Sequence, residues 1–116
     1  MELPQNFEAL IEQSTTSALY EKLIIQLNKD LLYANIDLEL HTETPPVSLK
    51  LTLQDAVYHL IQNKFSEYLN LLYIVDVSEA KVRALDGDDI VKLSEDITFL
   101  ILQREWQKVW YKAKFS

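Results

Sequence analysis

Cysteine is absent from this 116-residue chain, and turn-forming residues are scarce, with one glycine and three prolines. The lack of cysteine excludes a disulfide framework, a thiolate zinc site and a cysteine nucleophile. A single glycine cannot build the glycine-rich loops that hold nucleotide phosphates. So few turn-forming residues also argue against a sandwich or barrel and favour long helices.

Histidine and long apolar runs are scarce as well. His41 and His59 are the two histidines, and no serine lies in a nucleophile-elbow pattern, so no catalytic triad can be recognised. The longest apolar run, residues 71–75, is far too short to span a membrane. The first residues lack the basic stretch and apolar run of a signal peptide. We therefore expect a cytoplasmic protein.

Charge is distributed unevenly along the chain. Eighteen acidic and eleven basic residues give a formal net charge of −7 at pH 7. The excess of anions lies in residues 1–98, whereas residues 99–116 hold four cations and one anion. An acidic body disfavours binding to nucleic acid or to an anionic membrane surface. A cationic end on an acidic body also suits self-association.

Apolar residues recur mostly at helical spacing. The clearest case is residues 20–34, where they form one continuous stripe. Similar patterns predict helices near residues 5–13, 65–75, 78–85 and 89–112. The length fits one domain. We predict an all-α fold, a compact bundle of about five helices, in a single helical domain over residues 1–116.

The segment 36–53 has two interpretations. Apolar and polar residues alternate over 36–41 and again over 47–53, which is typical of a short β-hairpin. The apolar residues between 49 and 61 also fit one helical stripe, and proline is favoured in the first turn of a helix. Because the loop with two prolines lacks the positive-φ residues of tight hairpins, we favour an extended segment followed by a helix over 46–64.

The helical stripes also predict which side chains are buried. On the helix over 65–75, the side chains expected to face inward are Tyr68, Leu69, Leu72 and Tyr73. The residues expected in the deepest part of the core are Leu23, Leu27, Leu60, Ile97 and Leu100.

Two groups of polar residues allow a hypothesis of metal binding or catalysis. His59 follows Asp55 by four residues, so the two could share a proton or a divalent metal on one helix face. Asp86, Asp88 and Asp89 surround the only glycine, but their spacing does not match a helix–loop–helix calcium site. A helical ion pair at His59 and acidic capping of a helix start explain both groups more simply.

The final helix is the most informative segment. Its apolar face changes side partway along, and the aromatic half is expected to be covered either by the helix near residues 5–13 or by a partner. We predict that Trp106 packs within the protomer. The candidate protein interface consists of Arg104, Lys108, Trp110, Tyr111, Lys112 and Phe115, because interfaces are enriched in aromatic residues and arginine.

Two segments of the chain resemble segments of other proteins. Residues 71–79 (LLYIVDVSE) and 101–109 (ILQREWQKV) resemble paired segments of small bacterial proteins that are largely helical and have no known activity. The resemblance implies a bacterial helical domain and carries no catalytic residue, cofactor or substrate.

These observations favour a non-catalytic domain that acts through protein–protein contacts, with no cofactor. We expect its partner to be another protein or a second copy of itself, and neither nucleic acid nor a membrane. The alternative is a small metal-dependent enzyme or metal binder that uses Asp55, His59 and the aspartates at 86–89.

Overall fold

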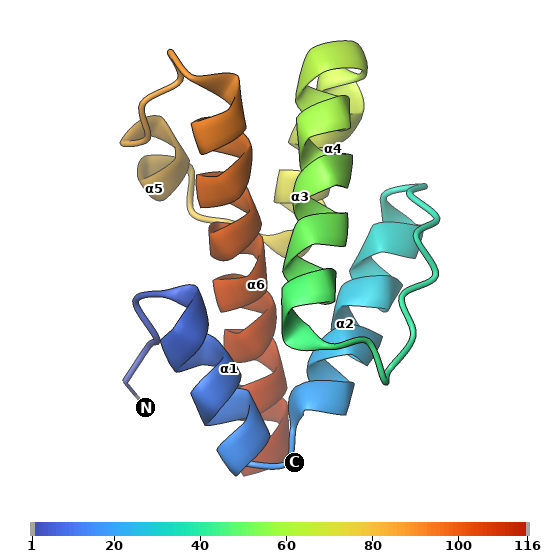
Figure 1. The fold of residues 1–116 in the computed structure, drawn as a ribbon, viewed down its shortest axis with the longest axis vertical. Helices are drawn as coiled ribbons and strands as arrows, with labels where there is room; N and C mark the ends of the chain where they lie inside the picture. Colours follow the sequence, from blue (N-terminus) through green and yellow to red (C-terminus); the bar gives the residue numbers. More distant parts are fainter. Residues whose placement is uncertain (1, 116) are drawn as a thin grey trace.

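The computed structural model describes residues 2–115, which form six α-helices and no strand (Figure 1). The helices are α1 (Phe7–Thr16), α2 (Tyr20–Tyr33), α3 (Pro46–Asn63), α4 (Phe65–Val75), α5 (Glu79–Arg83) and α6 (Ile90–Phe115). The all-α prediction is confirmed, although the described residues form six helices where about five were expected. None of the described helices has the length and apolar character needed to cross a membrane.

The hairpin interpretation of residues 36–53 is wrong, and the helix begins where the alternative placed it. Pro46 is the first residue of α3, where its missing N–H costs no helical hydrogen bond. The apolar stripe on this helix is buried at Leu49, Leu53, Val57 and Leu60. Burying this stripe against α4 and α6 stabilises the helix more than alternation favours a strand.

Helix α6 is the axis of the bundle. It runs the length of the molecule and contacts α1, α2, α3 and α4 (Figure 1). Its buried apolar side chains are Ile97, Ile101, Leu102, Trp106 and Val109. The core therefore surrounds one long helix.

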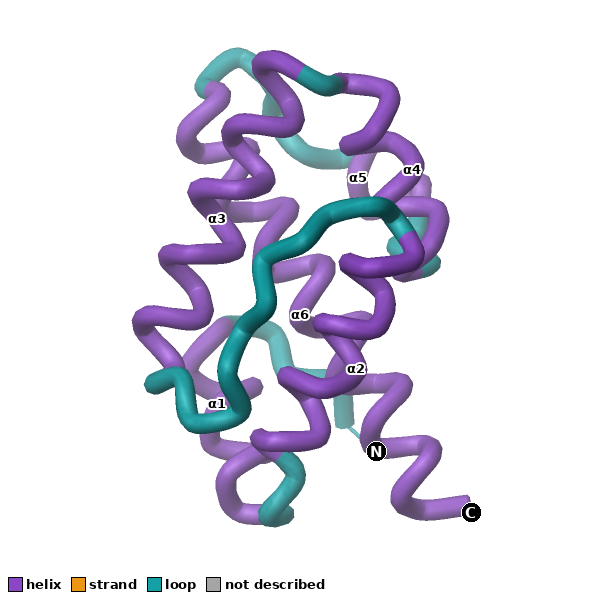
Figure 2. The backbone as a smooth tube through the Cα atoms, turned by 90° about the vertical axis from the view of Figure 1, so that its right-hand side faces the viewer, coloured by secondary structure: helices purple, strands orange, loops and turns teal. Residues whose placement is uncertain are grey.

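The segment between α2 and α3, residues 34–45, crosses the surface as an extended strap (Figure 2). The side chain of Asn28 on α2 holds it by two hydrogen bonds to the backbone of Leu40. Asn28 Nδ2 donates to the Leu40 carbonyl at 2.7 Å, and the Leu40 N–H donates to Asn28 Oδ1 at 3.0 Å. Tyr20 donates a further hydrogen bond from its hydroxyl to the carbonyl of Thr44 at 2.6 Å. The amide of Asn28 thus takes the place of a neighbouring strand.

Helices α3 and α4 are separated by one non-helical residue, Lys64. Tyr68 and Leu72 are buried on α4, as predicted. The prediction is wrong for Leu69 and Tyr73, which are exposed. An 11-residue helix that packs on α2, α3 and α6 with one side leaves its other apolar side without cover.

The change of face along α6 is explained by the neighbours of this helix. Trp106 is 1% exposed, which confirms that it packs within the protomer. Its indole Nε1 donates a hydrogen bond to Gln13 Oε1 on α1 at 3.0 Å. Helix α1 therefore covers the start of the aromatic half, as one of the two interpretations expected.

Four of the five residues predicted for the deep core are buried, and Leu100 is the exception because it is only half-buried. We expect Leu27→Ala to lower the free energy of unfolding by ~2–5 kcal/mol, through lost transfer energy and the cavity that remains. Leu100→Ala has the same effect on helix propensity and should cost roughly 1 kcal/mol or less. Urea denaturation of both variants checks this, and equal losses would contradict the assignment of the faces.

Candidate functional site

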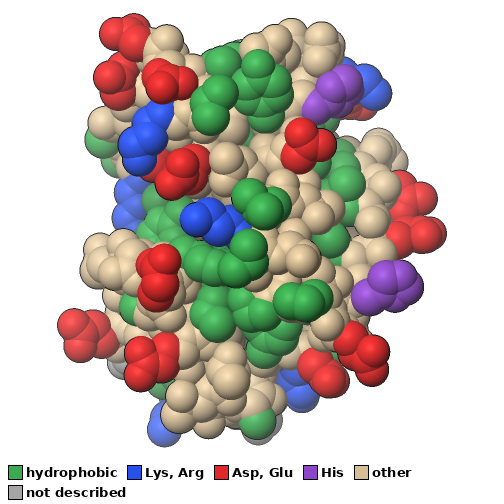
Figure 3. Space-filling view, viewed as in Figure 1, with side chains coloured by type: hydrophobic (Ala, Val, Ile, Leu, Met, Phe, Trp, Pro, Cys, Tyr) green, Lys and Arg blue, Asp and Glu red, His purple; other side chains and the backbone are tan. Residues whose placement is uncertain are grey.

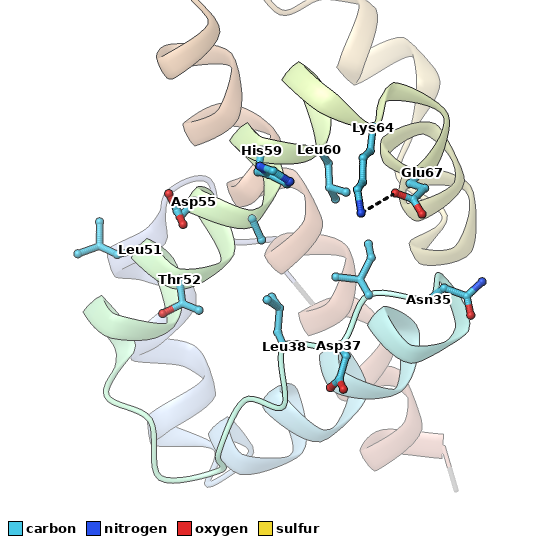
Figure 4. Close-up of a pocket in the computed structure, with 12 residues that line it drawn as sticks. Asn35, Asp37, Leu38, Leu51, Thr52, Asp55, His59, Leu60, Lys64 and Glu67 are labelled. Atoms are coloured by element: carbon cyan, nitrogen blue, oxygen red, sulfur yellow. Dashed lines mark ion pairs between the residues drawn. The ribbon is translucent and has the colours of Figure 1, made fainter.

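A groove with a volume of about 620 Å³ separates α3 from the strap and ends at the start of α4 (Figure 4). This volume falls within the range of small-molecule binding sites. Its apolar lining comes from both walls and consists of Ile36, Leu38, Leu51, Ala56 and Leu60.

The rim of this groove is acidic. Asp37 on the strap and Asp55 on α3 lie on opposite sides of it (Figure 4). Neither carboxylate forms an ion pair with any residue in the described range 2–115. At the end of the groove, Lys64 and Glu67 form an exposed pair with an Nζ–Oε2 distance of 3.8 Å. The groove therefore combines an apolar floor with two carboxylates that form no ion pair among the described residues.

The residues proposed for metal binding or catalysis do not come together. Asp55 and His59 both line the groove, but they form no hydrogen bond or ion pair with each other among the described contacts. Instead, His59 Nδ1 contacts Asn63 Nδ2 at 3.1 Å. Asp86, Asp88 and Asp89 precede α6 and do not line the groove. Over residues 2–115, no group of three or more potential metal ligands forms.

The aspartates before α6 have local structural partners. Asp86 Oδ1 accepts a hydrogen bond from the backbone N–H of Asp88 at 2.9 Å. Asp89 Oδ1 accepts from the N–H groups of Val91 and Lys92 at 3.0 and 3.2 Å. These contacts are those of a turn and a helix N-cap, the simpler of the two interpretations.

Two of the cations predicted for the interface on α6 are engaged within the chain. The Arg104 guanidinium donates to the carbonyl of Asp76 at 3.1 Å and to its carboxylate at 3.0 Å. Lys108 Nζ donates to Asp30 Oδ2 at 2.7 Å. Arg104 ties the α4–α5 connection to α6, and Lys108 ties α2 to α6.

The end of α6 carries a cluster of aromatic side chains, which we call the aromatic tip: Trp110, Tyr111 and Phe115. The Trp110 ring meets the other two edge to face, with centroids 5.3 and 6.4 Å away, and Tyr111 stacks on Phe115 at 5.7 Å. Trp110 packs partly on the core, whereas Tyr111 is 47% and Phe115 71% exposed. Lys112 and Lys114 flank the tip, are exposed, and pair with no acidic residue in the described structure.

A buried carboxyl group lies on α6 one turn before the aromatic tip. Glu105 is fully buried, and neither of its oxygens accepts a hydrogen bond from the described residues. Lys108 Nζ lies 3.4 Å from Glu105 Oε1, but it makes its shorter contact with Asp30. A buried carboxylate without hydrogen-bond donors is costly, so Glu105 favours its protonated form.

Burial raises the pKa of Glu105 to about 9. The neighbouring carboxylate of Asp30 contributes to this raised pKa, and Lys108 opposes it. At pH 7 the α2–α6 contact thus contains a protonated Glu105 beside the ion pair of Lys108 and Asp30. This combination is electrically neutral.

Sequence reasoning did not identify Glu105 or Asp30, although a signal was present. Glu105 lies four residues after Ile101 and four before Val109, which places it in the middle of a buried stripe. Asp30 lies three residues after Leu27 and four before Ala34, both of which are buried. A polar residue at these spacings indicates a buried ionisable group, and only the packing shows that the two groups meet.

The raised pKa predicts a pH dependence of stability. The folded state holds the proton on Glu105 up to about pH 9, whereas the unfolded chain releases it near the ordinary value of 4.5. The free energy of unfolding should therefore fall by up to ~1.4 kcal/mol per pH unit as the pH rises between these two values. Glu105→Gln keeps a neutral donor beside Asp30 and should remove this dependence.

Urea denaturation of both proteins from pH 5 to pH 8.5 measures this effect. Glu105→Gln should exceed the wild type in stability by more than ~1 kcal/mol at pH 8 and approach it near pH 5. Glu95→Gln, an exposed change on the same helix, controls for the loss of one carboxylate. Parallel pH profiles for the wild type and Glu105→Gln would show that Glu105 is ionised in the fold.

Comparison with known proteins leaves the site to be interpreted from its geometry. No protein-family model matches the chain, and no curated protein or solved structure shows significant similarity to it. The resemblance of residues 71–79 and 101–109 to small bacterial helical proteins stays a prediction.

Proposed function

We propose that this protein is a non-catalytic, cytoplasmic helical domain that acts through protein–protein contacts made by the aromatic tip. The main support for the proposal is that Tyr111 and Phe115 are exposed to solvent and that their rings stack on each other. Aromatic rings fixed in this way lose little conformational freedom on binding, and they supply the large contact areas that dominate interface energetics.

Helix α4 also exposes large apolar residues, namely Phe65, Leu69 and Tyr73. The aromatic tip differs from this surface in charge, because Lys112 and Lys114 lie beside its rings. The lysine next to Phe65, Lys64, is paired with Glu67. Apolar rings beside cations available for pairing favour a partner that combines an apolar patch with carboxylates.

A second copy of this chain provides such a partner. Residues 1–98 hold 17 of the 18 acidic side chains and 7 of the 11 basic ones. In Figure 3, acidic side chains surround the face on which hydrophobic side chains gather. Because the cationic end of one molecule is attracted by the acidic body of another, self-association is the contact that the charge distribution supports best.

Sedimentation equilibrium from micromolar to millimolar concentrations tests this proposal. The wild type should associate reversibly, and Tyr111→Ser/Phe115→Ser should raise the dissociation constant by about tenfold or more, because truncation of interface anchors commonly has effects of this size. Both changes are at exposed positions, so circular dichroism should show an unchanged helical fold. Tyr73→Ser removes an 81% exposed aromatic residue from α4 and is the matched control.

Two outcomes would overturn the proposal. One is a wild type that stays monomeric at every concentration, which would show that the protein does not self-associate. The other is association that the tip variant retains and Tyr73→Ser abolishes, which would assign the contact to α4.

A further inference from the structure

We infer that the groove between α3 and the strap receives the aromatic tip of a second copy, so that the molecules associate head to tail. This inference rests on the proposed function and adds to it the surface on which the tip docks. The groove and the tip have complementary chemistry. Aromatic rings flanked by lysines would enter an apolar groove whose rim carries Asp37 and Asp55.

The apolar part of the groove suits an aromatic side chain. Leu38 on the strap and Leu51 on α3 both belong to its lining. Leu51 is 56% exposed, so part of this apolar surface is in contact with solvent. A ring placed between the walls would remove apolar surface of both molecules from water, which is the main favourable term in association.

The charges favour this groove over the other large apolar groove of the molecule. That second groove lies between α4 and α5, and its two carboxylates are already paired, Asp76 with Arg104 and Glu79 with Arg83. In the groove beside the strap, Asp37 and Asp55 form no ion pair with the described residues, and the lysine at its end, Lys64, is paired with Glu67. The two aspartates are therefore available to Lys112 and Lys114 of an incoming molecule.

A molecule cannot place its own tip in its own groove. In Figure 2, helix α2 lies between α3, which lines the groove, and the end of α6. The contact is therefore intermolecular and joins two different surfaces. Such a heterologous contact leaves one groove and one tip free in a dimer, so further molecules can add until a ring closes or an open chain forms.

The contact is small. Three aromatic side chains, one of them partly buried in its own protomer, cover less than the roughly 800 Å² per partner of a standard stable interface. The association is accordingly weak and reversible, and it requires high protein concentrations to be observed.

Complementation between two variants tests this arrangement. The groove variant, Asp37→Lys/Asp55→Lys, keeps an intact tip, and the tip variant, Tyr111→Ser/Phe115→Ser, keeps an intact groove. All four positions are exposed, so the fold should persist in both. Asp86→Lys/Asp88→Lys makes the same change of charge in the exposed loop before α6 and is the matched control for the groove variant.

We expect each variant alone to be monomeric where the wild type and the Asp86→Lys/Asp88→Lys control associate. An equimolar mixture of the groove and tip variants should form a complex of two chains and no larger species. The intact tip of the groove variant would occupy the intact groove of the tip variant. The unused groove and the unused tip of this complex are the mutated ones, so no further molecule could add. Sedimentation velocity at matched total concentration measures both results.

The outcomes separate this inference from the proposed function. If the tip variant is monomeric and the groove variant associates like the wild type, the tip binds elsewhere and the groove assignment is wrong. If both variants are monomeric and the mixture stays monomeric, the contact is not head to tail. If the tip variant associates like the wild type, the proposed function itself fails.

Discussion

The packing of α6 is the constraint on which the rest of the structure depends. A helix of 26 residues in the centre of a small bundle has to be covered along its length by shorter helices. Helices α3 and α2 provide most of this cover, and α1 extends it to Trp106. The side of α6 that is buried changes along the helix because different neighbours meet it at different heights. The apolar pattern of α6 appears irregular in the sequence because each part of the helix packs against a different set of helices.

The neighbouring helices do not cover the last residues of α6, and the proposed function depends on this exposed end. Trp106 is enclosed and hydrogen-bonded to α1, whereas Phe115, nine residues later, is 71% exposed. Between them, Lys108 pairs with Asp30 in the neutral cluster that also contains the protonated Glu105. This cluster fixes α2 against α6 just before the aromatic tip, which thus has a rigid base on the projecting end of α6 (Figure 2). A rigid base lowers the entropy cost of binding.

Periodicity predicted most of the fold from the sequence, and it failed where burial depends on neighbours. The stripe on α2 and the start of α3 at Pro46 follow from spacing and proline chemistry alone. The helical spacing that places Leu72 on the inward face also allows Leu69 and Tyr73 to lie there. These two side chains are exposed because α4 lies at the edge of the bundle. The groove joins residues 35–38 to residues 51–67, and no local pattern shows that these segments meet. The aromatic tip was predictable because its signal, aromatic residues beside cations near a helix end, is local.

A photo-cross-link from the aromatic tip tests head-to-tail docking most directly. A photoreactive phenylalanine analogue at position 115 would be irradiated in a mixture of isotopically light and heavy chains, and the linked peptides would be identified by mass spectrometry. Head-to-tail docking predicts light–heavy links from residue 115 to the groove, in residues 35–38 or 51–67 of the other molecule. Links that join the tips of two molecules, or links confined to single molecules, would contradict it.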